Sequence, residues 1–228
     1  MLKSLNQNLN DVGFIVREKN IFGNVVKCRC GRDFIYYSLN YFFKDKFNTS
    51  NISALKLEKS YSLGLILPWW STWTQLQFIF LPRFLRSQGL NLQINGNKIN
   101  NFLDFFLVIT VPNSFRSVFF ASAFAKDKSK CVISADDAVM KVQKAVDSGL
   151  ATGIDISMGL GGLMDHVMFV YGYDEENFYI FDSHIVRNLN YEKVQGFKDD
   201  NFYMKLPKSE VKNRWTKFGR VWVLKMVN

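Results

Sequence analysis

The sequence of 228 residues is poor in the residues that bind metals and cross-link small domains. It has two histidines, His166 and His184, and three cysteines, Cys28, Cys30 and Cys131. Three cysteines cannot form an even disulfide framework, so we expect reduced thiols in a cytosol-like compartment. Any chemistry that needs an imidazole must use one of the two histidines. The search for a histidine-dependent site is thus confined to two positions.

Targeting signals are also scarce. Residues 1–14 lack the continuous apolar stretch of a secretory signal, so we expect a cytoplasmic protein, with export by a signal-independent route left open. Residues 60–82 carry no charge over a length that could cross a bilayer, but their proline and many polar residues favour globular structure. Within them, the aromatic residues at 61–80 could form a groove that binds a protein partner or a membrane surface.

The charge balance is strongly basic, with a formal net charge of +9. Residues 198–228 hold eight basic and three acidic residues, which gives +5 for that segment alone. These charges alternate with apolar residues, as on the solvated face of packed elements, and no nucleic-acid-binding motif accompanies them. We therefore expect no nucleic-acid partner, and an anionic surface or substrate remains an alternative.

The chain should fold, because 48% of its residues are hydrophobic and 16% aromatic. Its length suits one domain over residues 1–228. The pattern predicts a buried helix at 32–43, the end of a short helix at 83–88, a helix between Ser134 and Gly149, strands at 151–157, 166–172, 178–181 and 220–226, and a short helix at 209–216. An early buried helix and a late antiparallel sheet make an α+β fold.

The strands at 166–172 and 178–181 should form a hairpin with its turn at 174–177. His166 begins the first strand and Asp182 follows the second, so antiparallel pairing brings them side by side. A carboxylate there can accept a hydrogen bond from the imidazole and fix its tautomer. The pattern predicts an oriented general base.

Cys30 is the candidate nucleophile for that base. It directly precedes Gly31 and the predicted helix, whose N-terminus would favour the thiolate, while glycine leaves room for a substrate carbonyl. Acyl transfer also needs donors for the developing oxyanion. The side-chain amide of Asn24 and the backbone N–H of Cys30 could supply them.

These features together resemble the papain-like cysteine peptidases, specifically the double-glycine type that processes bacteriocin leaders, and its bacterial relatives. The resemblance rests on Cys30-Gly31 at a helix start, on the run AVMKVQKAVDSGLATGIDIS followed by DHVMFVYGYDEENFYIFDS, and on the final NRWTKFGRVWVLK. It covers about 110 residues and leaves the middle third unmatched.

The resemblance implies a papain-like fold and a peptidase that needs no metal or cofactor. It implies Cys30 as nucleophile, His166 as general base and acid, Asp182 as the residue that orients the base, and Asn24 as an oxyanion donor where relatives usually have glutamine. Cys30-Gly31-Arg32-Asp33 replaces the commoner Cys-Gly-Pro opening. The substrate would be a peptide or another acyl compound. An acyltransferase with the same triad and a catalytically silent binding module are the alternatives.

Simpler interpretations stand beside these. Cys30 could be a buried structural thiol, Cys28 could be the nucleophile, and the two could share a zinc ion with a histidine, although their spacing is unusual for that. Asp165 is expected in a solvated loop and His184 on the surface. The glycines at 159–162 are expected at a cleft rim, because no Lys-Ser/Thr pair follows them to form a phosphate loop.

Overall fold

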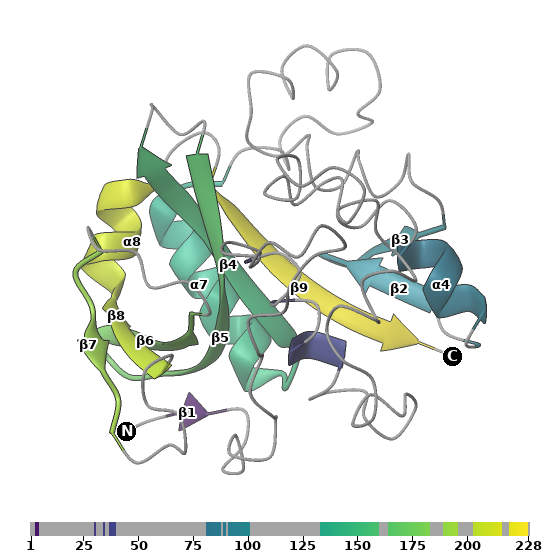
Figure 1. Ribbon diagram of the computed structural model, residues 1–228, viewed down its shortest axis with the longest axis horizontal. Helices are drawn as coiled ribbons and strands as arrows, with labels where there is room; N and C mark the ends of the chain where they lie inside the picture. Colours follow the sequence, from purple (N-terminus) through teal and green to yellow (C-terminus); the bar gives the residue numbers. More distant parts are fainter. Residues whose placement is uncertain are drawn as a thin grey trace, which may run out of the picture.

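The computed structural model describes residues 3–4, 30, 34, 37–39, 81–87, 89, 91–100, 133–159, 164–182, 189–195, 203–215 and 219–227. Within them, one large antiparallel sheet dominates and three helices with defined ends lie around it (Figure 1). The helices are α4 (Leu81–Ser87), α7 (Ala135–Asp147) and α8 (Lys208–Arg214). The expected α+β class is confirmed at this level.

The sheet has nine strands among the described residues, and every pairing is antiparallel. They are β1 (Lys3–Ser4), β2 (Asn91–Ile94), β3 (Asn97–Ile99), β4 (Ala151–Gly159), β5 (Met164–Tyr173), β6 (Asn177–Phe181), β7 (Glu192–Lys193), β8 (Tyr203–Pro207) and β9 (Arg220–Val227). Their order is β3-β2-β9-β4-β5-β6-β8-β7, and β1 pairs with the end of β5. The hairpin of β5 and β6 thus lies inside the sheet.

Helix α7 has strong signals at both ends. The hydroxyl of Ser134 accepts a hydrogen bond from the backbone N–H of Asp137 at 3.0 Å, which satisfies a donor of the first turn. At the other end Gly149 has a φ of 66°, and the N–H groups of Gly149 and Leu150 donate to the carbonyls of Val146 and Ala145. This is a Schellman ending, and it confirms the helix predicted between Ser134 and Gly149.

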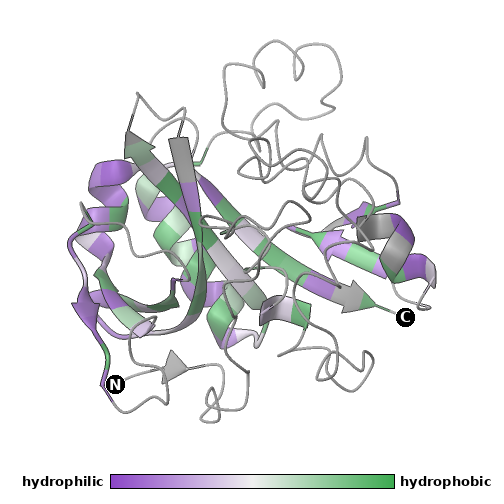
Figure 2. Ribbon diagram, in the orientation of Figure 1, coloured by the Kyte–Doolittle hydropathy of each residue, from purple (hydrophilic) through white to green (hydrophobic). Residues whose placement is uncertain are grey.

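The main hydrophobic core lies between α7 and one face of the sheet. Its members come from α7, from alternate positions of β4, β5, β6, β8 and β9, and from α8, and include Val142, Ile154, Met168, Ile180 and Val221. Alternate strand residues share a face, so these side chains form one apolar layer. In Figure 2 hydrophilic residues dominate α8, while hydrophobic residues dominate the middle of β5 and β9.

The opposite face of the sheet contacts a segment from the N-terminal part of the chain. Cys30, Phe34 and residues 37–39 have helical backbone and are buried, and we call them the Cys30 segment. The Phe34 ring lies 6.3 Å from that of Phe169 in β5 and 6.0 Å from that of Trp222 in β9, and Tyr37 stacks on Phe181 at 3.8 Å. The predicted early helix packs on the late sheet.

Gly153 explains how closely this segment approaches β4. A Cβ at that position would lie 2.7 Å from Phe34 Cε2, well inside van der Waals contact. The glycine therefore leaves room for the Phe34 ring, and any larger residue would push the Cys30 segment away from the sheet.

The turn between β5 and β6 is fixed by one carboxylate. Asp174 Oδ1 accepts hydrogen bonds from the backbone N–H groups of Glu176 at 3.0 Å and Asn177 at 2.7 Å, and Oδ2 accepts from the Tyr179 hydroxyl at 2.9 Å. Burial alone would raise the pKa of Asp174, but these hydrogen bonds outweigh it and hold the pKa below its ordinary value. We call this part of the hairpin the turn end.

Lys208 fastens the turn end to the start of α8. Its Nζ donates to the backbone carbonyls of Asp174 at 2.6 Å and Glu175 at 2.8 Å, and the same nitrogen lies 5.2 Å and 5.6 Å from the ring centroids of Tyr173 and Phe178. Burial lowers the pKa of Lys208, and the charges of Asp174 and Glu175 oppose that shift. The contacts of the buried Lys208 thus hold the turn end in a fixed position.

Several sequence expectations need correction. Cys30 is itself helical, so it does not stand just before the helix as predicted, and α8 begins at Lys208. The hairpin of β2 and β3 was not predicted, although its turn is Asn95-Gly96, with φ of 51° and 81°, the pair most typical of a two-residue hairpin. Strands β1, β7 and β8 were not predicted either.

Other expectations are confirmed or lie outside the described residues. The short helix before Gly89 is present, and Gly89 has the expected positive φ of 73°. In the described part of the chain no helix is long and apolar enough to cross a membrane. The aromatic segment at 61–80 lies outside the described residues.

Candidate active site

The open end of the hairpin, opposite the turn, brings His166 and Asp182 together. Phe169 pairs with Phe181, the last residue of β6, and His166 and Asp182 lie beyond this pair at the open end. His166 Nε2 lies 2.7 Å from Asp182 Oδ1, and the two residues are 2% and 1% exposed. The contact that the hairpin argument predicted is therefore present and buried.

The second oxygen of Asp182 has a partner that the sequence did not suggest. The Tyr191 hydroxyl donates a hydrogen bond to Asp182 Oδ2 at 3.1 Å. A buried carboxylate is costly unless hydrogen bonds compensate for the lost water. The imidazole of His166 at one oxygen and the phenol of Tyr191 at the other provide such compensation. Together they hold the carboxylate in one orientation.

The contact with Asp182 gives the two ring nitrogens of His166 different roles. An ionised carboxylate only accepts hydrogen bonds, so Nε2 facing Asp182 carries the proton in the neutral ring. Nδ1 is then the basic nitrogen. A substrate or nucleophile that gives a proton to His166 must do so at Nδ1.

Cys30 lies in the segment that packs on the same sheet, with 7% of its surface exposed. The pleat of β5 separates two sets of contacts. His166 pairs with Ile156 and shares the face of Met168, both of which belong to the core on the α7 side. Phe169, on the other face, contacts the Cys30 segment. Because these two sets of contacts lie on opposite faces of the sheet, the Cys30 thiol can meet His166 Nδ1 only at the end of β5 where His166 lies.

The remaining predicted positions divide into two groups. Asp165 lies in β5 and pairs with Ser157, so its expected place in a loop was wrong. Gly159, one of the glycines expected at a cleft rim, is the last residue of β4. Asn24, Cys28, Cys131 and His184 lie outside the described residues, as do 160–163.

Within the described segments no three histidine, cysteine, aspartate or glutamate side chains gather closely enough to hold a metal ion. Arg220 and Asp155 form a second buried charged contact at 3.8 Å, on the face of the sheet that Phe34 covers. Acid–base chemistry of His166 and Asp182 is what this site supports.

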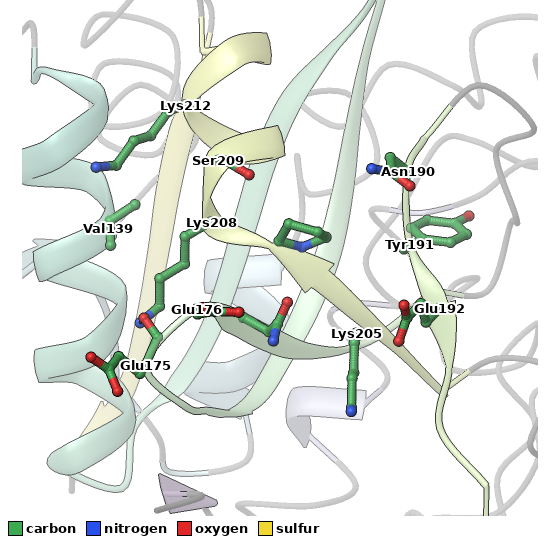
Figure 3. Close-up of a pocket in the computed structure, with 12 residues that line it drawn as sticks. Val139, Glu175, Glu176, Asn190, Tyr191, Glu192, Lys205, Lys208, Ser209 and Lys212 are labelled. Atoms are coloured by element: carbon green, nitrogen blue, oxygen red, sulfur yellow. The ribbon is translucent and has the colours of Figure 1, made fainter.

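A cavity of about 710 Å³ lies beside the turn end and extends to the segment that carries Tyr191 (Figure 3). Helices α7 and α8, the turn end and the segment around β7 surround it. Its walls carry both charges, from three glutamates and three lysines, among them Glu192 and Lys208. Tyr191 is the wall residue that also contacts Asp182, so one phenol links the cavity to the buried pair.

Sequence reasoning missed Tyr191 because no local pattern marks it. It lies nine residues after Asp182, beside a strand of two residues, and its neighbours form no motif. Only the pairing of β7 with β8 folds this segment back over the hairpin. Comparison with known proteins adds no further residue, because no family model, curated protein or solved structure matches the chain.

Proposed function

We propose that this protein is a cysteine-nucleophile hydrolase of papain-like fold, with residues 1–228 as one domain, and that it cleaves peptide or other amide bonds. The observation that carries the proposal is the buried contact of 2.7 Å between His166 Nε2 and Asp182 Oδ1. It is an oriented base at the end of a strand, in a chain whose Cys30 segment packs on the same sheet. We expect no cofactor.

In the first step Cys30 loses its proton and attacks. The Sγ proton passes to His166 Nδ1, and Asp182 stabilises the resulting imidazolium through Nε2. The thiolate adds to the substrate carbonyl carbon, and the carbonyl oxygen becomes an oxyanion. Donation from the Cys30 backbone N–H and the Asn24 amide would stabilise that charge.

In the second step the intermediate collapses and the carbon–nitrogen bond breaks. His166 returns its proton to the leaving amine, and the acyl group stays on Cys30 as a thioester. Water, activated by the neutral imidazole, then releases the acid and restores the thiol. If an amine replaces water, the same site is an acyltransferase.

A specific observation supports a second candidate, a papain-like module that binds without catalysis. The pleat directs His166 toward the α7 side, whereas Phe34 and Tyr37 contact the other face. In such a module the only role of His166 and Asp182 would be to satisfy each other's hydrogen-bonding groups inside the core.

Alkylation of the thiols distinguishes the two candidates. At neutral pH iodoacetamide should label Cys30 faster than Cys131, and His166→Ala should slow the labelling of Cys30 by about 100-fold, the lower range for loss of a general base. His184→Ala, which removes the other histidine, is the matched control and should change nothing. Slow labelling of all three cysteines at equal rates, read by mass spectrometry, would exclude the enzyme.

A further inference from the structure

A tyrosine hydroxyl reaches each of three aspartates in the described part of the chain. Tyr173 donates to both oxygens of Asp147 at 2.9 Å, Tyr179 donates to Asp174 at 2.9 Å, and Tyr191 donates to Asp182 at 3.1 Å. Asp147 is exposed and Asp174 half-buried, whereas Asp182 is 1% exposed. The third pair is the one whose carboxylate also contacts an imidazole.

We propose that Tyr191 is a positioning residue for the base, holding Asp182 so that Oδ1 stays directed at His166 Nε2. This inference rests on the proposed function for its catalytic meaning and extends it to a residue outside the expected triad. Tyr191 does not touch the reacting atoms. Its effect passes through the carboxylate.

The physical basis is the freedom of a carboxylate to rotate. The terminal torsion of an aspartate side chain is broad and roughly two-fold, so a single contact at Oδ1 does not fix its plane. A second hydrogen bond at Oδ2 from a ring packed against the core does. With the plane fixed, the proton of neutral His166 stays on Nε2, and Nδ1 stays ready to accept a proton from a thiol.

The position of Tyr191 gives the same contact a second consequence. Tyr191 is one of the residues that line the cavity, next to Asn190 and Glu192, so the residue that donates to Asp182 also borders this hollow (Figure 3). Any change that moves the ring would also release Oδ2. The cavity lining and the carboxylate that orients His166 thus have one residue in common.

The test is Tyr191→Phe, which removes one oxygen atom and keeps the ring. Nitrogen-15 shifts of the His166 ring should show the Nε2–H tautomer in the native protein and a mixture of tautomers in the variant. The alkylation rate of Cys30 should fall about fivefold, the scale of one hydrogen bond. Tyr179→Phe is the matched control, because it removes the same kind of tyrosine–aspartate bond from the turn end. Tyr179→Phe should leave the His166 tautomer and the Cys30 alkylation rate at their native values.

A second measurement needs no substitution at Tyr191. In the native protein the Tyr191 hydroxyl proton should be protected from exchange with solvent, and Asp182→Ala should remove that protection. If His166→Ala leaves Cys30 alkylation unchanged, the proposed function fails while the tautomer result still decides the role of Tyr191. If Cys30 depends on His166, but Tyr191→Phe keeps both the native tautomer and the native rate, the positioning role is wrong.

Discussion

Each end of the β5–β6 hairpin carries an aspartate that accepts a hydrogen bond from a tyrosine hydroxyl. The two carboxylates differ in their surroundings. At the turn end, Asp174 is half-buried, and its other partners include the backbone N–H groups of Glu176 and Asn177. At the open end, Asp182 is buried and its partners include the imidazole of His166. The first arrangement closes a turn, and the second orients a base.

The difference shows what makes a hydrogen-bonded carboxylate a candidate for function. Asp174 gains these partners within five residues, and its bonds to the backbone N–H groups two and three residues on are the usual chemistry of a turn aspartate. Asp182 takes two partners from 16 and nine residues away, and both come from other strands or segments of the sheet. A buried carboxylate with distant, titratable partners costs stability to build, and such groups concentrate at functional sites.

The largest expected effect separates the two aspartates by the same substitution. Asp182→Ala should slow Cys30 alkylation at least tenfold and lower the free energy of unfolding by about 3 kcal/mol, because it breaks a buried pair. Asp174→Ala should lower the free energy of unfolding by about 1 kcal/mol and leave Cys30 alkylation unchanged. Thiol labelling and urea unfolding on both variants check this. Equal effects of the two variants on Cys30 would remove the distinction between the ends.

A smaller effect is expected where Lys208 fastens the turn end. Lys208→Met keeps the apolar stem but loses both hydrogen bonds to carbonyls, so the free energy of unfolding should fall by about 2 kcal/mol. Lys212→Met is the control, since this more exposed lysine forms a surface ion pair with Asp136, worth under about 1 kcal/mol. Urea unfolding measures both. A change in the His166 tautomer on Lys208→Met would show that the turn end also acts on the base.

The smallest effect concerns pH. The pKa of Asp174 is lowered in the folded protein, so its stabilising contribution is complete above the pKa of the unfolded chain and is lost as pH falls through the lowered value. Asp174→Asn should therefore make the urea midpoint less dependent on pH in the acid range. Urea unfolding of the native protein and of Asp174→Asn, at neutral and at acid pH, measures this. An identical loss of stability on acidification in both proteins would contradict the prediction.

The hairpin and its His166–Asp182 contact could be predicted because their signals are local. Apolar strands on both sides of Asp174-Glu-Glu-Asn177 define the turn, and antiparallel pairing then places the two ends together. The capped helix α7 was predictable for the same reason. Asn95-Gly96 was an equally local signal for the β2–β3 hairpin that the sequence interpretation overlooked.

Tyr191 and the packing of the Cys30 segment could not be predicted, because they depend on long-range contacts. Tyr191 reaches Asp182 only when β7 pairs with β8, and Phe34 reaches β5 and β9 only when Gly153 leaves room for its ring. Neither requirement appears in the residues next to them. The fold class was thus readable from periodicity, whereas the full surroundings of Asp182 needed the three-dimensional structure.

The most direct test of the account is whether the Cys30 thiol and the His166 imidazole meet. 1,3-Dibromoacetone is a short reagent that a thiolate attacks at one carbon and an imidazole at the other, with loss of bromide at each step. Treated protein should yield, after digestion and mass spectrometry, a cross-link between the peptides of Cys30 and His166. Modification of Cys30 by the same reagent with no cross-link to His166 would contradict the proposed enzyme and leave the His166–Asp182–Tyr191 network as part of the core alone.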